Sequence, residues 1–290
     1  ITDNGQFEYL IKQGDYHRKI LGDFHKAIEW YERALALDPN NIEALSKEAR
    51  AFYNLYNFSS ASKFVDKALA IEPNDLEALT SKAGVYGYPG EISNGVRYVD
   101  KALEISPNDV GALIDKGFLL TYRGNYSEAI QIIDKALEIN PNSEDALYAK
   151  GYALDLEGHR AEALDYYDKA LEISPNHVGA LVKKAMIIFD QGNYSQAVEY
   201  TNKALKISPT NTFALDKQGI MYEDLGNYSE ALENYNKGLA VNPNDVRLLT
   251  DKAWIYFNNK GNYSGAINLF DKALDIDPNN TYDQSSIAYL

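Results

Sequence analysis

The sequence predicts an all-α protein built from repeated helical hairpins, and three periodic features of its 290 residues support this. The first is a spacing of 34 residues between prolines, which occurs six times in succession before a last spacing of 35. The second is a leucine followed four residues later by alanine or glycine, which places both on one face of a helix. The third is a glycine in most periods, where a tight turn between two helices needs backbone freedom. The prolines are Pro39, Pro73, Pro107, Pro141, Pro175, Pro209, Pro243 and Pro278.

Each period begins with the first helix of a hairpin. Proline lacks an amide hydrogen and disfavours helix in the residue before it, so the preceding helix must end there. Asparagine follows the proline at Asn40, Asn74 and Asn142. We expect its side chain to cap the next helix, because an acidic residue three positions later gives the spacing of a capping box. The leucine and small residue of the first helix are Leu45 and Ala49, Leu79 and Ala83, Leu113 and Gly117, Leu147 and Gly151, Leu181 and Ala185, Leu215 and Gly219, and Leu249 and Ala253.

A glycine marks the turn into the second helix of the hairpin. The second helix carries alanines seven residues apart, such as Ala129 and Ala136, which permit a neighbouring helix to approach closely. In the first copy Leu10 and Gly22 are twelve residues apart, as in the last copy, whereas the middle copies have eleven. We therefore expect one extra residue in each terminal hairpin. The turn glycines are Gly124, Gly158, Gly192, Gly226 and Gly261.

This succession of residues resembles the tetratricopeptide repeat. The resemblance extends over about residues 7–280 and implies a right-handed α-solenoid superhelix of helix-turn-helix hairpins, with first helices on the concave side and second helices on the convex side. One hairpin cannot bury both of its faces, so stacked neighbours form the core. The phrases Gly-Asn-Tyr-Ser and Asp-Lys-Ala-Leu resemble prokaryotic repeat proteins, archaeal ones included, more than eukaryotic ones. In one copy the resemblance is carried by Leu113, Gly117, Gly124, Tyr126, Ala129, Ala136 and Pro141.

The predicted domain organisation is a single solenoid over residues 1–290. It has eight repeats and a short C-terminal tail at 281–290. The recurring Asp-Lys pairs, such as Asp134 with Lys135, are interpreted as a solvated helix face. The repeats are expected at about 7–41, 42–75, 76–109, 110–143, 144–177, 178–211, 212–245 and 246–280.

Composition excludes several classes of protein. Lysine and arginine total 28 against 42 aspartate and glutamate, and a net charge of -14 repels phosphate backbones. The chain has no cysteine, which excludes disulfides and thiolate zinc sites. No apolar run approaches the roughly 18 residues of a membrane span. We expect no nucleic-acid partner, no metal, no cofactor and no catalytic activity. The histidines, which lack the spacing of zinc hydrolases, are His17, His25, His159 and His177.

The resemblance places the residue five positions after each first-helix leucine on the concave surface. From the fourth copy onward this series is apolar: Phe118, Tyr152, Met186, Ile220 and Trp254. Neighbouring concave positions add Tyr148 and Phe189, with Asp155, Asp216 and Glu223 between them. An apolar groove edged with acid predicts a protein or peptide partner, helical or extended, that is apolar and mildly basic. The alternative is that these side chains only pack against one another across a tight superhelix.

Six acceptor sequences for N-glycosylation, Asn-x-Ser/Thr, exceed the number of about two expected by chance. Five of them follow the turn glycine or its equivalent, where the chain should be exposed. Copying of one turn with the repeat is the alternative explanation. The chain starts at Ile1 instead of Met, which indicates a processed or trimmed chain, and on balance these features favour an extracellular or cell-surface location over a cytoplasmic one. The acceptors are Asn57, Asn125, Asn193, Asn227, Asn262 and Asn279.

Both ends of the predicted solenoid carry apolar residues. A solenoid normally ends with a helix whose outer face is polar. Two different uncovered ends that meet make a heterologous contact, which propagates into a filament unless a ring closes. The alternative function is therefore a structural subunit that assembles head to tail with copies of itself, and a trimmed chain that stays monomeric is the competing explanation. The residues concerned are Phe7, Leu10, Ile11, Ile287, Tyr289 and Leu290.

Overall fold

The computed structural model describes residues 3–21, 23–55, 57–87, 91–259 and 261–276. These ranges contain sixteen α-helices, one π-helical segment and no strand, so the predicted all-α fold is confirmed. The chain forms two compact units, residues 1–180 and 181–290, and each is described by itself. The assignment of residues 1–290 to a single solenoid domain stays a prediction.

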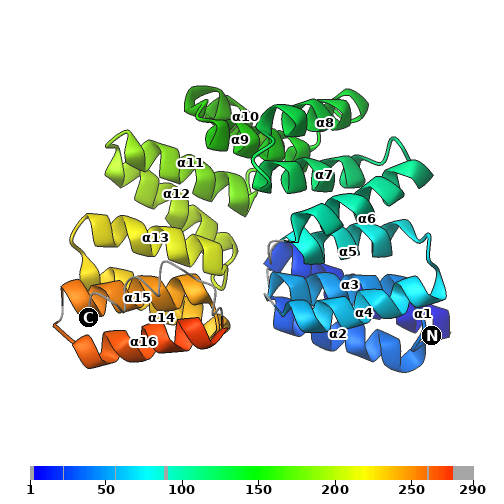
Figure 1. The fold of residues 1–290 in the computed structure, drawn as a ribbon, viewed down its shortest axis with the longest axis horizontal. Coiled ribbons are helices and arrows are strands. Elements are labelled where there is room, and N and C mark those ends of the chain that lie inside the picture. Colours follow the sequence, from blue (N-terminus) through cyan, green and yellow to red (C-terminus); the bar gives the residue numbers. More distant parts are fainter. Residues whose placement is uncertain (1–2, 22, 56, 88–90, 260, 277–290) are drawn as a thin grey trace. The chain divides into compact units, whose positions relative to one another are not determined.

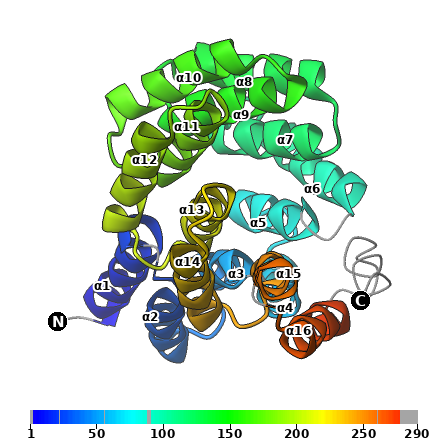
Figure 2. The same cartoon turned by 90° about the vertical axis from the view of Figure 1, so that its left-hand side faces the viewer.

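Unit 1 consists of hairpins in which a first helix packs on the helix that follows it (Figure 1). Each hairpin also packs on the next, and the first helices α3, α5, α7 and α9 contact one another in order. In both views the second helices α8 and α10 cover α7 and α9 (Figure 2). The helices of unit 1 are α1 (Asp3–Asp15), α2 (Phe24–Leu37), α3 (Ile42–Asn54), α4 (Phe58–Ile71), α5 (Leu76–Gly87), α6 (Ile92–Ile105), α7 (Val110–Tyr122), α8 (Tyr126–Ile139), α9 (Glu144–Glu157) and α10 (Arg160–Ile173).

Unit 2 repeats this scheme. Its helix α13 pairs with α14 and α15 pairs with α16, while the first helices α13 and α15 also touch. Helix α11 begins three residues before the unit does. The helices are α11 (Val178–Asp190), α12 (Tyr194–Ile207), α13 (Thr212–Asp224), α14 (Tyr228–Val241), α15 (Val246–Asn258) and α16 (Tyr263–Ile276).

Within a hairpin, the small residue of the first helix faces a large side chain from the second. A Cβ atom placed on Gly151 would lie 2.8 Å from Cε1 of Tyr167, whose side chain is completely buried. Ala83 instead shares its core cluster with the smaller Val99. The two helices are therefore matched in volume, because close-packed interiors tolerate neither overlap nor voids.

The residues that cap the first helices differ from the predicted ones by one position. Asn41 and Ser143 accept the capping hydrogen bonds of α3 and α9, at 3.1 and 3.2 Å from the amides of Ala44 and Ala146. Asn40, Asn74 and Asn142 instead lie in the turn that follows the preceding second helix. The cap of α5 is Asp75, not Asn74. The predicted cap position was wrong because both the proline and the residue after it belong to the turn. The backbone becomes extended only at the second residue after the proline, and that residue is the cap.

The turns inside the hairpins follow the predicted pattern. All five predicted turn glycines have positive φ, from 60° at Gly261 to 100° at Gly158, a conformation that side chains disfavour. The extra residue of the first hairpin coincides with the π-helical segment η1 (Tyr16–Leu21). A π-helix takes up one more residue per turn than an α-helix, so it explains the longer spacing between Leu10 and Gly22.

Polar side chains join consecutive hairpins of unit 1. Lys150 of α9 reaches back to Asp134 of α8, with 2.6 Å between its ammonium nitrogen and the carboxylate. The lysine of another Asp-Lys pair, Lys101, donates to the carbonyl of Pro73 at 2.8 Å. The Asp-Lys pairs are thus partly solvated, as interpreted, but they also hold neighbouring hairpins together.

Candidate functional site

A groove of about 670 Å³ crosses the first helices of unit 1. Residues of α3, α5, α7 and α9 line it, and His177, just before α11, closes one end. Its polar residues are mainly acidic, and its apolar lining combines two aromatic rings, Phe118 and Tyr148, with aliphatic side chains such as Leu76 and Ile114. Because the first helices contact one another, residues about 34 positions apart in sequence become neighbours here.

One arginine links three first helices in the groove. The Nε atom of Arg50 donates to Oγ of Ser81 at 2.9 Å, and Nη2 donates to Oγ1 of Thr80 at 3.0 Å. The same guanidinium lies 3.9 Å from a carboxylate oxygen of Asp115 in α7. The position of Arg50 is therefore fixed by two hydroxyl groups, and its ion pair with Asp115 is long.

The carboxyl group of Asp115 has an unusual environment. Burial in the groove raises its pKa to about 6, and this effect outweighs the attraction of Arg50, which lowers the pKa. The carboxylates of Asp109 and Asp145 raise it further by repulsion. The Asp115 side chain nevertheless keeps 36% of its surface exposed, so an incoming group can reach it.

Aromatic rings form the wall of the groove and continue beyond it. The ring centroids of Phe118 and Tyr148 are 6.0 Å apart, and Tyr152 lies 6.1 Å from Phe118 and 6.3 Å from Tyr148. Tyr122, which is well exposed, contacts Tyr152 edge to face at 6.0 Å. Three predicted residues, Phe118, Tyr148 and Tyr152, are thus brought together across two hairpins.

His177 completes this end of the groove. Its Nδ1 accepts a hydrogen bond from the amide of Ala180 at 3.0 Å and so caps α11. Nε2 therefore carries the proton of the neutral ring, and it lies 3.3 Å from Oδ1 of Asp145. The ring centroid lies 4.8 Å from that of Tyr148. No role was predicted for His177 from the sequence. Its position two residues after Pro175, equivalent to that of Asn41 after Pro39, could have indicated a helix cap.

The predicted apolar residues of unit 2 lie in more than one place: Met186 and Phe189 share one cluster, whereas Trp254 belongs to another. Met186 and Phe189 are half-buried against a cluster that includes Ile188 and Met221. Trp254 is half-buried, with its ring centroid 5.8 Å from Phe257. Ile220 is half-buried as well.

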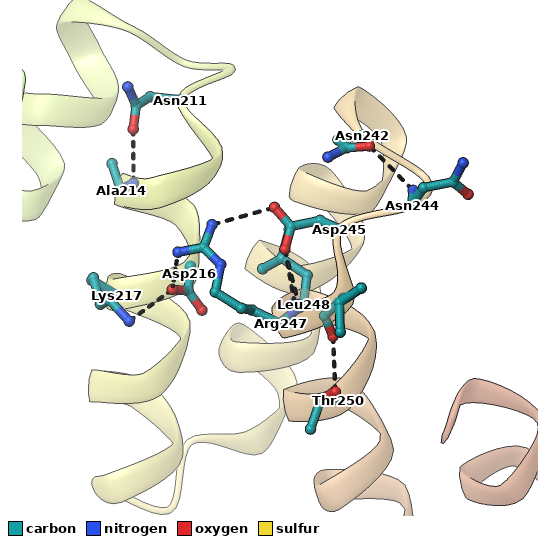
Figure 3. Close-up of polar contacts among 11 residues, drawn as sticks. Asn211, Ala214, Asp216, Lys217, Asn242, Asn244, Asp245, Arg247, Leu248 and Thr250 are labelled. Atoms are coloured by element: carbon teal, nitrogen blue, oxygen red, sulfur yellow. Dashed lines mark hydrogen bonds and ion pairs between the residues drawn. The ribbon is translucent and has the colours of Figure 1, made fainter. Parts of the chain in front are cut away.

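Asp216 does not lie at an acidic edge, contrary to expectation. Its side chain is only 1% exposed and points between α13 and α15, where Lys217 approaches it at 2.8 Å and Arg247 at 3.7 Å (Figure 3). The two cations explain why this carboxylate is buried instead of solvated. Burial and repulsion by Asp216 raise the pKa of Asp251 on α15.

The other two predicted acids have partners of their own. Glu223 accepts a hydrogen bond from the hydroxyl of Tyr235 at 3.1 Å, and burial raises its pKa. Asp155 lies 3.9 Å from Arg160 at the end of its hairpin. Neither acid lines the groove of unit 1.

The predicted glycosylation acceptors share one structural position within the described residues. Each is exposed and immediately precedes a second helix. The side chain of Asn57 accepts from the amide of Ser60, whereas the amide nitrogen of Asn193 donates to Gln196 at 2.9 Å. Asn279 lies outside the described residues. The others are Asn57, Asn125, Asn193, Asn227 and Asn262.

The expected apolar N-terminal end is largely covered. Leu10 and Ile11 are only 2% and 5% exposed, because they pack with α2 in the core of the first hairpin. Their side chains are therefore mostly covered by this chain, contrary to expectation, although Ile11 also lines a hollow at the surface. Phe7 is half-buried and lines a hollow of about 440 Å³ beside Asp15. Ile287, Tyr289 and Leu290 lie outside the described residues.

No helix in the described part of the chain is long and apolar enough to cross a membrane. No group of three or more histidine, aspartate or glutamate side chains there is arranged to hold a metal ion.

Comparison with known families and structures gives consistent matches. The sequence model for anaphase-promoting complex, cyclosome, subunit 3 matches residues 122–204, and two tetratricopeptide repeat models match residues 20–83 and 217–281. Among solved structures, a chain of the APC/C hetero-tetramer Cut9-Hcn1 has a TM-score of 0.64 and 18% identity over 90% of this chain. This chain spans only 51% of that one. No curated protein matches the sequence.

A second solved structure agrees in fold. A tetratricopeptide repeat protein from Parabacteroides merdae ATCC 43184 gives a TM-score of 0.60 and 20% identity, with 86% of this chain and 98% of that chain covered. At such identities the likeness concerns the fold alone. The family follows from the three sequence-model matches, which together extend over most of the chain, and from the repeated hairpins: the chain is a tetratricopeptide repeat protein.

Proposed function

We propose that this chain is a non-catalytic scaffold that binds a protein or peptide partner through the groove of unit 1. The observation that carries the proposal is the groove itself, because four first helices contribute side chains to one concave surface. Its anchors are the half-buried rings of Phe118 and Tyr148, which line it, and of Tyr152, which contacts both of them at the end of the groove, since aromatic side chains dominate the binding energy of protein interfaces. Proteins of this repeat family are generally scaffolds for protein interaction.

The chemistry of the groove defines the kind of partner. Its aromatic wall favours apolar side chains, and its carboxylates disfavour acidic ones. An apolar, mildly basic segment, helical or extended, therefore fits best. In unit 2, the half-buried residues Met186, Phe189, Ile220 and Trp254, together with Glu223, are further candidates for contact with a partner.

Peptide selection tests this proposal. Random dodecapeptides displayed on phage are selected against the full chain, and the enriched peptides are then measured against Tyr152→Ala. We expect this variant to lose about tenfold or more in affinity, as for a central aromatic anchor. Its melting temperature should change no more than that of Ile139→Ala, a control on the exposed face of α8. Enriched peptides that bind Tyr152→Ala as tightly as the wild type would refute the groove as the site.

A second candidate function is an extracellular, N-glycosylated subunit that assembles head to tail. It is supported by the exposed acceptor asparagines, which recur at one position of the hairpin, and by the hollow beside Phe7, which could receive the tail of another copy. Intact mass of native material reports glycans. Deletion of residues 286–290 should abolish polymer, and a full-length chain that stays monomeric in light scattering at high concentration contradicts assembly.

A further inference from the structure

The geometry points to a place in the groove of unit 1 for one cationic side chain of the partner, an arginine or a lysine, between the carboxylate of Asp115 and the rings of Phe118 and Tyr148. This inference rests on the proposed function and specifies its chemistry. The sequence predicted a mildly basic partner but not this place, which brings Asp115 and Phe118 of α7 together with Tyr148 of the next hairpin.

The groove carries an excess of negative charge. Its one arginine, Arg50, faces five acidic residues: Asp75, Glu77, Asp109, Asp115 and Asp145. The guanidinium of Arg50 is held mainly by two hydroxyl groups and approaches Asp115 only to 3.9 Å. A cation placed closer to Asp115 would form the stronger, charge-assisted hydrogen bonds that Arg50 does not make.

The acidic residues of the groove differ in whether they cap a helix. Asp75 and Asp109 cap α5 and α7, each accepting a backbone hydrogen bond of 2.7 Å. Asp115 caps no helix, and its raised pKa shows that burial in the groove costs its charged form more than Arg50 repays. A bound cation would lower this pKa, so binding and proton release from Asp115 are linked.

The aromatic rings of the groove provide a second favourable contact for a cationic side chain. A cation within about 6 Å of an aromatic ring centroid is attracted by the face of the ring. Unit 1 already uses this contact elsewhere, since Lys150 lies 4.6 Å from the ring centroid of Tyr166 and Lys82 lies 5.0 Å from that of Tyr86. The rings of Phe118 and Tyr148 therefore suit a cationic side chain as well as the apolar stem that carries it.

An anionic group is a weaker candidate for this place. The N-termini of α5, α7, α9 and α11 lie along one edge of the groove, and helix N-termini attract anions. Each of them is already capped by a side chain, namely Asp75, Asp109, Ser143 and His177. An incoming anion would meet carboxylates at two of these caps instead of unpaired amides.

The test uses small blocked amino acids and one built-in reporter. N-acetyl-arginine methylamide is titrated into the full chain while the histidine ring signals are followed by NMR, with His177 assigned through His177→Gln. We expect the His177 signal to shift and saturate, because His177 lines the groove. The signals of His25 and His159, which lie elsewhere and are exposed, should not move.

Matched variants locate the binding place. Asp115→Asn should weaken arginine binding about 3- to 10-fold, as expected for loss of one charge-assisted contact. Asp145→Asn, whose carboxylate is mostly exposed, gives a smaller loss and does not depend on the core of the fold. Asp165→Asn, an exposed aspartate on α10, is the control and should leave the titration unchanged.

The outcomes separate this inference from the proposed function. If N-acetyl-norleucine methylamide shifts His177 as strongly as the arginine compound, or if the arginine compound causes no shift up to its solubility limit, the inference is wrong. Peptides enriched by phage selection would then still support the groove as an apolar site. Failure of both the titration and the selection would remove the proposed function as well.

Discussion

Joints between neighbouring hairpins in units 1 and 2 use different chemistry at one and the same place in the repeat. In unit 1 this place is Glu48 in one hairpin and lysine in the next three, and Lys82, Lys116 and Lys150 each approach an aspartate of the preceding second helix to 2.6 or 2.7 Å. Lysine recurs at this place at residues 184 and 252 of unit 2. Between them, the place is occupied at residue 218 by glutamine, which donates to Oγ1 of Thr201 at 2.9 Å and to Oδ1 of Asn202 at 2.8 Å.

The neutral joint of unit 2 is more extensive than a charged pair. The amide nitrogen of Asn234 donates to Oε1 of Gln218 at 3.2 Å, so one glutamine bridges the second helices on both sides. Its amide has both oxygen and nitrogen engaged, which a lysine cannot achieve. The comparison shows that each of the three lysines of the unit 1 joints has a charged partner, whereas the neutral amide has neutral partners. A buried charge or amide without such a partner is destabilising.

The largest expected effect comes from putting the lysine of a unit 1 joint in place of Gln218 in unit 2. Gln218→Lys buries an ammonium group beside Thr201 and Asn202, with no carboxylate at the matching position, and should destabilise unit 2 by about 3 kcal/mol. Urea unfolding followed by fluorescence measures this. The chain has two tryptophans, one in each unit, so Trp30→Phe leaves Trp254 as the reporter of unit 2.

A second substitution checks the cause of this effect. Gln218→Lys combined with Asn202→Asp recreates the pair found in unit 1, so it should recover at least half of the lost stability. No recovery in the double variant would mean that the glutamine acts through packing or through Asn234, and that the two joints are not equivalent.

A buried glutamate gives unit 1 a pH dependence of its own. Glu48 on α3 is fully buried, its carboxylate oxygens have no hydrogen-bond partner, and burial raises its pKa to about 8. The folded state therefore holds a proton that the unfolded state releases above its ordinary pKa of 4.5, and stability falls as pH rises from about 4.5 to 8.

Removing this charge should stabilise unit 1 at alkaline pH. Glu48→Gln is expected to gain about 2 kcal/mol at pH 8 and to match the wild type near pH 4, because only the ionised carboxylate is costly. Unfolding of Trp254→Phe, in which Trp30 reports unit 1, checks both values. Unit 2 should keep its own dependence on pH, which arises from Asp251 beside Asp216. An equal gain at both pH values would contradict the titration of Glu48.

A smaller effect is expected when the aspartate of a unit 1 joint is neutralised. Asp66→Asn removes the negative charge beside the ammonium group of Lys82, which is only 3% exposed, and leaves Ser62 and the new amide oxygen as neutral acceptors, so it should cost about 1 kcal/mol. The control is Glu233→Gln, whose pair with Lys237 has the same 2.7 Å length but lies in solvent, and whose loss should leave the unfolding midpoint unchanged. Equal effects of the two variants would show that burial does not set the strength of the joint.

The sequence allowed the hairpins to be predicted because their causes are local. A leucine and a small residue four positions apart indicate which helix face is buried, and a glycine such as Gly124 indicates a turn with positive φ. The cap was predicted at Asn40 instead of Asn41 because spacing alone does not show how many residues the proline turn uses. Local patterns thus predict elements well and their boundaries less well.

The groove was predictable only in part, because it depends on contacts between hairpins. Phe118 and Tyr148 were predicted from their position on the first helices, but Asp115 and Arg50 meet only after three successive hairpins have stacked. Asp216 shows the opposite error, since its place on the helix suggested an exposed edge and its neighbours Lys217 and Arg247 made burial possible. One feature of the sequence could have indicated the groove. Asp75, Asp109 and His177 each lie two residues after a repeat proline, so equivalent positions of stacked hairpins bring them to the same edge of the groove.

The volume match inside each hairpin limits how this chain can be rearranged. Gly151 makes room for Tyr167, whereas Ala83 faces Val99, so the first helix of one hairpin does not fit the second helix of the other. Pairing α5 with α10 would push a methyl group into a tyrosine ring, and pairing α9 with α6 would leave a void where a ring belongs. Whole hairpins, and not single helices, are therefore the smallest pieces that gene duplication or recombination can move along this chain without loss of packing. Whoever shortens or lengthens it should cut at the proline turns between hairpins and leave the glycine turns within them intact.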